Sequence, residues 1–81
     1  MVTPKNIEQY ISQGLACEHI AVDGDGHHFE AVIVSAAFEG KRLIARHQLV
    51  YLALGDRMRQ EIHALSMKTL TPAEWAGQPA A

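Results

Sequence analysis

The chain has 81 residues, of which 48% are hydrophobic and 20% charged, and its formal net charge is −2 at pH 7. This length suits one small domain of ordinary soluble composition, and the single cysteine, Cys17, excludes a disulfide framework within the chain. The acidic balance excludes a general attraction to phosphate. No apolar run reaches the roughly 18 residues of a membrane span and no signal peptide pattern opens the chain, so we expect a cytoplasmic protein.

The first part of the chain predicts a helix and then a strand. Thr3 and Pro4 are typical of an N-cap and a first helical turn, and apolar residues then recur at three- and four-residue spacing up to about Leu15. Residues 18–25 alternate between polar and apolar and end in a turn signal, which indicates a short strand.

The clearest strand signal is the stretch HFEAVIVSAAF, residues 28–38, which is rich in β-branched side chains. Gly24, Asp25 and Gly26 separate it from the preceding strand and supply the residue types of a tight turn. The two strands are therefore predicted to form an antiparallel hairpin. Gly40 then breaks the pattern in a turn.

A long helical segment is predicted from Arg42 to about Gln60, with Gly55 and Asp56 as the point at which it can divide in two. Its apolar positions follow helical spacing, and we expect them to face the core. They are Leu43, His47, Val50, Tyr51, Leu54 and Met58.

The last part of the chain predicts a strand and a short helix. Residues 61–70 alternate with period two, which places His63 and Leu65 on one face of a strand. The sequence TPAEWAG at 71–77 is typical of a threonine-capped helical turn, from which Trp75 can fold back on the core. Residues 78–81 are expected to form a disordered tail.

The resulting order is α-β-β-α-α-β with a short C-terminal helical turn. It indicates a single domain over residues 1–77, of α+β class, in which helices pack on a three-stranded sheet. The pattern leaves open which of the two hairpin strands lies beside the last strand.

Histidine is the only plentiful metal-binding residue type, with five copies in the chain. No phosphate-binding loop, nucleophile elbow or paired metalloprotease histidines are present, so we expect no enzymatic activity. His27 and His28 lie at the start of a strand, where alternation sends neighbouring side chains to opposite faces. At most one of them can therefore join a given site, and His28 is the better anchored because it precedes the core-facing Phe29.

His47 lies on the apolar stripe of the long helix, whereas His63 begins the last strand, where its ring can reach solvent. Each of these histidines, taken alone, is better explained as a structural residue, half-buried and hydrogen-bonded for His47 and solvated for His63, and His19 is assigned no role. One loop histidine and one strand-end histidine offer two ligands, whereas a structural zinc site takes four. A metal held here would need further ligands from another molecule.

Four motifs in this order resemble the BolA-like protein family, in its bacterial BolA/IbaG-type, histidine-loop branch. They are F-x-G at 38–40, R-H-Q-x-V-Y at 46–51, I-H-A-L at 62–65 and T-P-x-E-W at 71–75. The similarity runs from about Ile7 to Trp75. It implies a fold related to class II KH domains. It also implies a heterodimer with a monothiol glutaredoxin, in which a two-iron two-sulfur cluster is shared with the glutaredoxin and glutathione.

The resemblance further implies which residues would bind that cluster. His63 corresponds to the family's C-terminal histidine ligand, and the second ligand falls in the GHHF segment. We assign it to His28, with His27 and then His47 as alternatives. The expected role is that of an adaptor in iron–sulfur cluster trafficking or iron homeostasis. Histidine ligation would raise the cluster potential and make binding sensitive to pH, because the ring must lose a proton to bind.

The alternative function is that of a nucleic-acid-binding transcriptional regulator of stress response and cell morphology, because some BolA-like proteins are described in such terms. Its candidate residues are Lys41, Arg42, Arg46, Arg57 and Arg59. The segment FEGKR at 38–42 contains one glycine and departs from the G-x-x-G loop of KH domains. A homodimer and a DNA partner remain open, whereas no membrane and no small-molecule substrate are expected.

Overall fold

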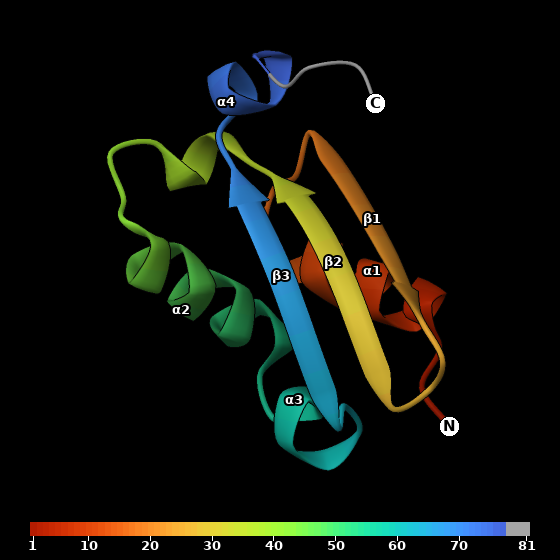
Figure 1. Ribbon diagram of the computed structural model, residues 1–81. Helices are drawn as coiled ribbons and strands as arrows, with labels where there is room; N and C mark the ends of the chain where they lie inside the picture. The colour runs from red at the N-terminus through yellow and green to blue at the C-terminus, as the bar shows by residue number, and fades with distance from the viewer. Residues whose placement is uncertain (78–81) are drawn as a thin grey trace.

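The computed structural model describes residues 1–77, so the tail predicted at 78–81 lies outside the described residues. Its sheet consists of β1 (His19–Gly24), β2 (His28–Val34) and β3 (Ala64–Leu70). Helices α1 (Pro4–Gly14) and α2 (Leu43–Leu54) lie behind the sheet in Figure 1, and within residues 1–77 the opposite face of the sheet carries no long helix. The predicted α+β class, with helices packed on a three-stranded sheet, is confirmed.

Helix α1 begins where the sequence predicts. The Thr3 hydroxyl accepts a hydrogen bond from the Asn6 backbone N–H at 3.1 Å, and the Asn6 side chain accepts one from the Thr3 N–H at 3.1 Å. This reciprocal cap satisfies two N–H groups that the helix itself leaves free. Ile7 and Ile11 are fully buried, so the apolar stripe of α1 faces the core.

The sheet has the order β1-β2-β3. Strands β1 and β2 form the predicted antiparallel hairpin, with His19 opposite Val34. Strand β3 pairs with β2 in parallel, from His28 opposite Ala64 to Val34 opposite Leu70. The beginnings of β2 and β3 therefore lie at the same end of the sheet.

The strand predicted over residues 28–38 is too long, because β2 ends at Val34. The Ser35 hydroxyl donates a hydrogen bond to the Ala16 carbonyl at 2.6 Å and accepts one from the Ala37 N–H at 3.1 Å. Ser35 thereby caps a short 3-10 helix, Ala36–Phe38, that turns the buried Phe38 into the core. Side-chain capping of this kind competes with continuation of the strand.

The helical segment divides at Gly55 as predicted, and α3 (Arg57–Gln60) follows the break. Gly55 has φ 59°, a left-handed conformation that glycine adopts without steric cost. The predicted core-facing stripe is only partly correct. Val50 and Leu54 are buried, whereas Leu43 is 60% and Tyr51 41% exposed.

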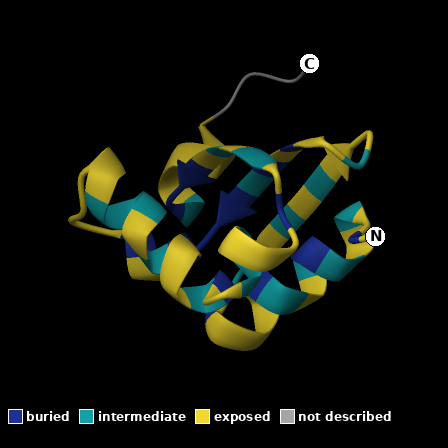
Figure 2. Cartoon of the chain, turned by 90° about the horizontal axis from the view of Figure 1, so that it is seen from below, coloured by how far each residue is buried: buried dark blue, intermediate teal, exposed yellow. Residues whose placement is uncertain are grey.

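The reason for this difference is that α2 packs against both α1 and β3. The residues that face these two elements are buried, and they are only partly those of the predicted stripe. A Cβ atom on Gly14 would lie 2.8 Å from the Cα of Ala53, so the two helices cross with almost no space between their backbones. Figure 2 shows dark blue, buried residues concentrated between the sheet and the helices, and yellow, exposed residues on the outer sides.

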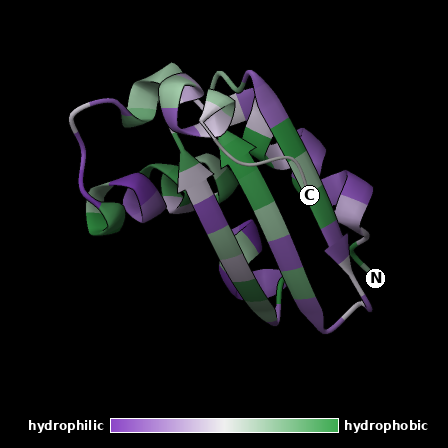
Figure 3. Ribbon diagram, turned by 45° about the horizontal axis from the view of Figure 1, so that its top comes forward, coloured by the Kyte–Doolittle hydropathy of each residue, from purple (hydrophilic) through white to green (hydrophobic). Residues whose placement is uncertain are grey.

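Helix α4 (Pro72–Ala76) is capped by Thr71, whose hydroxyl accepts from the Glu74 N–H at 3.1 Å. The prediction that Trp75 folds back on the core is wrong. Its side chain is 41% exposed and its ring stacks on His19, with centroids 4.6 Å apart. Figure 3 shows green, hydrophobic colouring at the C-terminal end of β2 and purple, hydrophilic colouring where β1 begins at this end of the sheet.

Within residues 1–77, no helix has both the length and the hydropathy that a membrane crossing requires.

Candidate metal-ligand site

The turn between β1 and β2 holds both loop histidines by their backbones. One oxygen of the Asp25 carboxylate accepts hydrogen bonds from the N–H of His27 at 2.9 Å and of His28 at 2.8 Å. These bonds stabilise the carboxylate and lower the pKa of Asp25. Gly26 supplies the positive φ of 100° that the turn requires. The sequence GDGHH therefore encodes a turn with a fixed backbone.

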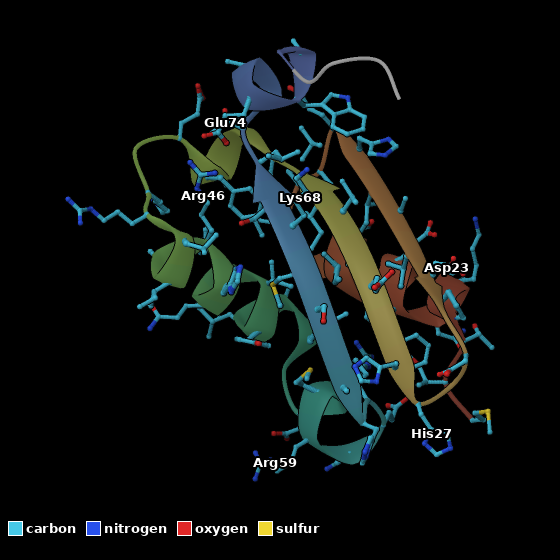
Figure 4. The ribbon with its side chains drawn as sticks, in the orientation of Figure 1. Asp23, His27, Arg46, Arg59, Lys68 and Glu74 are labelled. Atoms are coloured by element: carbon cyan, nitrogen blue, oxygen red, sulfur yellow. The ribbon has the colours of Figure 1, made fainter. Side chains whose placement is uncertain are left out.

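The structure brings His27 beside His63. The Ala64 N–H donates to the His27 carbonyl at 3.1 Å, which continues the parallel pairing of β2 and β3 by one residue. The two imidazole rings lie edge to face, with centroids 5.8 Å apart and an interplanar angle of 89°. Both residues are exposed. Figure 4 shows His27 at the end of the sheet where β2 begins. We call these two residues the histidine pair.

His28, the loop residue assigned as ligand from the resemblance, lies differently. It is the first residue of β2 and is exposed, whereas the next residue, Phe29, is fully buried in the core. Alternation along the strand therefore directs His28 to the face of the sheet opposite the helices. The ring contact with His63 is made by the alternative, His27.

The remaining histidines are placed outside this pair. His19 is opposite Val34, at the other end of the sheet, and stacks on Trp75. His47 is half-buried in α2, and in the described part of the chain its Nε2 atom has no hydrogen-bond partner. Across residues 1–77, no group of three or more histidine, cysteine or carboxylate side chains could hold a metal ion. The histidine pair is thus at most half of a ligand set.

The side chain of Arg46, one of the predicted nucleic-acid-binding residues, is hydrogen-bonded to other residues of the same chain. Its guanidinium donates to both carboxylate oxygens of Glu74, at 2.7 and 3.3 Å, and to the Thr69 carbonyl at 3.1 Å. Its Nε donates to the Lys41 carbonyl at 2.8 Å. Figure 4 shows Arg46 and Glu74 lying close together. Only 13% of the Arg46 side chain is exposed, so it is poorly placed to contact phosphate.

Two other predicted basic residues also have internal partners. Arg57 lies over the ring of Tyr10, 4.0 Å from its centroid, and Arg59 forms an ion pair with Asp56 at 2.9 Å. Lys41 and Arg42 are exposed. The sequence showed five basic residues in this region, but it did not show that three of them contact side chains of the same chain.

A family model described as BolA-like protein matches residues 9–74. The chain is 44% identical over 80 residues to "Protein BOLA2" of Arabidopsis thaliana, covering 93% of this chain and 85% of that protein. It is 35% identical over 82 residues to "DNA-binding transcriptional regulator BolA" of Haemophilus influenzae, covering 89% and 80%. A solved bolA protein homologue from Coxiella burnetii has a TM-score of 0.83 and 49% identity, covering 94% and 99%.

Proposed function

Because this chain belongs to the BolA-like protein family, we propose that it is a non-enzymatic adaptor that binds a monothiol glutaredoxin and co-ligates a bridging two-iron two-sulfur cluster. Its role is then cluster trafficking or iron homeostasis. The observation that carries this proposal is the histidine pair, His27 and His63, exposed at one end of the sheet.

The chemistry of the pair fits half of such a centre. Neutral imidazole is an iron ligand in two-iron two-sulfur clusters, where two histidines can replace two cysteines on one iron. A two-iron cluster needs four protein or thiol ligands, and the described residues bring two histidines together. The remaining two ligands are expected from the cysteine of the glutaredoxin and from glutathione. When bound, the cluster would supply iron and sulfide for transfer and a one-electron redox centre.

Each residue of the site has a separate part in this proposal. His63 and His27 present their rings to the partner, and Asp25 holds the backbone of the loop that carries His27. His28, the loop ligand that the resemblance implies, stays a candidate beside His27, since cluster binding with a partner could recruit the ring on the other face. Because the loop is exposed, a partner can approach the pair without any movement of the core.

Co-expression with a monothiol glutaredoxin tests the proposal. We expect a coloured heterodimer, and we expect His63→Ala and His27→Ala to change its visible absorption and circular dichroism. His28→Ala is the matched control, because it removes the neighbouring ring from the same turn. A spectrum that His63→Ala leaves unchanged contradicts the ligand assignment. A change with His28→Ala but not with His27→Ala assigns the loop ligand to His28.

A second function, nucleic-acid binding, is favoured by the name of the Haemophilus influenzae relative and by the exposed Lys41 and Arg42. With three of the five basic residues occupied, we expect weak binding of labelled duplex DNA that falls steeply between about 50 and 200 mM salt. Titration at both salt concentrations measures this. Sequence-specific binding that persists at the higher salt would support the nucleic-acid-binding function.

A further inference from the structure

Helix α2 exposes most of the large apolar side chains that the described part of the chain leaves in solvent. Ile44 is 76% and Leu52 77% exposed, and Tyr51 is 41% exposed. A helix at the surface of a small protein normally carries polar residues on its outer side. Here both sides of α2 are apolar, since Val50 and Leu54 on the inner side are buried in the core.

These exposed residues share one side of the helix. Ile44, Gln48, Tyr51, Leu52 and Gly55 follow the spacing of positions i, i+4, i+7, i+8 and i+11, and we call them the α2 outer face. The last four line an open hollow of about 410 Å³. Helical spacing of anchors beside a hollow is the geometry by which one amphipathic helix receives another.

Exposed positive charge lies beside the N-terminal end of the α2 outer face. Residues 41–60 contain five of the seven basic residues. Arg46 and Arg59 are ion-paired with Glu74 and Asp56, and Arg57 lies over Tyr10, so the exposed positive charge beside the face is that of Lys41 and Arg42. Lys41 and Arg42 stand exposed at the N-terminal end of α2. A positively charged border disfavours a second copy of the same face and favours an acidic partner.

We propose that the α2 outer face is a docking site for an acidic amphipathic helix of a partner protein. Apolar side chains of that helix would cover Ile44, Tyr51 and Leu52, and its carboxylates would face Lys41 and Arg42. Protein is favoured over nucleic acid because the centre of the face is apolar, whereas nucleic-acid interfaces are polar and positively charged. The proposal shares no residue with the histidine pair and goes beyond the adaptor function.

A titration followed by nuclear magnetic resonance tests this surface. The probe is a synthetic 18-residue helix, capped at both ends, with leucines at three- and four-residue spacing and glutamates on its flanks. Added to ¹⁵N-labelled protein, it is expected to shift the amide resonances of residues 42–55. Leu52→Glu is expected to weaken binding by about tenfold or more, because it removes a central apolar contact and adds a like charge. Leu52 is exposed, so the variant keeps its fold, which the dispersion of its spectrum checks.

Matched control variants separate the effect on peptide binding of charge at this face from that of charge elsewhere on the protein. Arg42→Glu is expected to weaken binding of the acidic peptide, whereas Lys5→Glu, the same charge change on α1, leaves it unaltered. A peptide with lysine in place of glutamate is expected not to bind. Three results would overturn the proposal. The first is no shift of the amide resonances of residues 42–55 at millimolar peptide, and the second is tighter binding of duplex DNA than of the peptide, measured by shifts of the same resonances. The third is that the wild-type protein is a dimer that Leu52→Glu dissociates.

Discussion

The side chain of Arg46 joins three segments of the fold at the scale of a single residue. It contacts the Lys41 carbonyl before α2, the Thr69 carbonyl of β3 and the Glu74 carboxylate of α4. The Glu74 carboxylate also accepts a hydrogen bond from the Thr71 N–H at 2.8 Å. The hydrogen bonds from Arg46, together with those from Thr71, lower the pKa of Glu74 to about 2.

This pKa predicts how stability depends on pH. Glu74 has a lower pKa in the folded chain than its ordinary value of 4.5, so the unfolded chain binds its proton first as pH falls. The stabilisation from ionised Glu74 is complete above about pH 5 and is lost progressively toward pH 2. We expect Glu74→Gln to lower the melting temperature at pH 7. As pH falls toward 2, the melting temperature of the variant is expected to approach that of the wild type.

Thermal unfolding followed by circular dichroism at several pH values measures this difference. Because nearly half of the Glu74 side chain is exposed, solvent screens part of the interaction and the effect is modest. Glu39→Gln is the control, since Glu39 is exposed and lies outside this network. A difference between wild type and Glu74→Gln that stays constant from pH 7 to pH 2 would contradict the ion-pair explanation.

At the scale of elements, the crossing of α1 and α2 depends on the absence of a side chain at Gly14. An added Cβ would lie 2.8 Å from the Ala53 Cα and 2.9 Å from its Cβ, which is closer than such atoms can approach. The obstacle is helix backbone, so the helices themselves would have to move apart. Alanine gains up to about 1 kcal/mol of helix propensity over glycine, whereas overpacking costs typically about 1–3 kcal/mol.

We therefore predict that Gly14→Ala is destabilising, by about 1–2 kcal/mol, because the steric cost exceeds the gain in propensity. Urea unfolding measures the change. Gly77→Ala is the control: its Cβ would meet atoms at 3.5 Å or more, and we expect a change within about 0.5 kcal/mol. A stabilised Gly14→Ala variant would show that the crossing accommodates a methyl group.

The elements that sequence predicts well are those whose signals are local. The caps of α1 and α4 are set by Thr3 and Thr71 within one helical turn, and the hairpin by Gly24 to Gly26. The early end of β2 was missed because the Ser35 hydroxyl bonds to Ala16, which is distant in sequence. Leu43 and Tyr51 were misplaced because the neighbours of α2, rather than its own periodicity, decide which side is buried.

At the scale of the whole molecule, the site depends on which strand lies beside which. Sequence pattern identified the histidine motifs, but it could not decide between partners for β3, and only parallel pairing with β2 brings residue 27 to residue 63. The resemblance assigns the loop ligand to His28, whereas the ring contact with His63 is made by its neighbour His27. Likewise, the partners of Arg46 and Arg57 lie far along the chain, at Glu74 and Tyr10, so periodicity and spacing could not reveal them.

Parallel pairing of β2 with β3 also determines at which stage of chain synthesis His27 and His63 can come together. A ribosome delivers the hairpin and His27 first, and His63 follows only after α2 and α3 have been synthesised. A truncated chain that ends before β3 carries His27 without His63. Two adjacent imidazole rings are therefore a property of a chain that already includes β3.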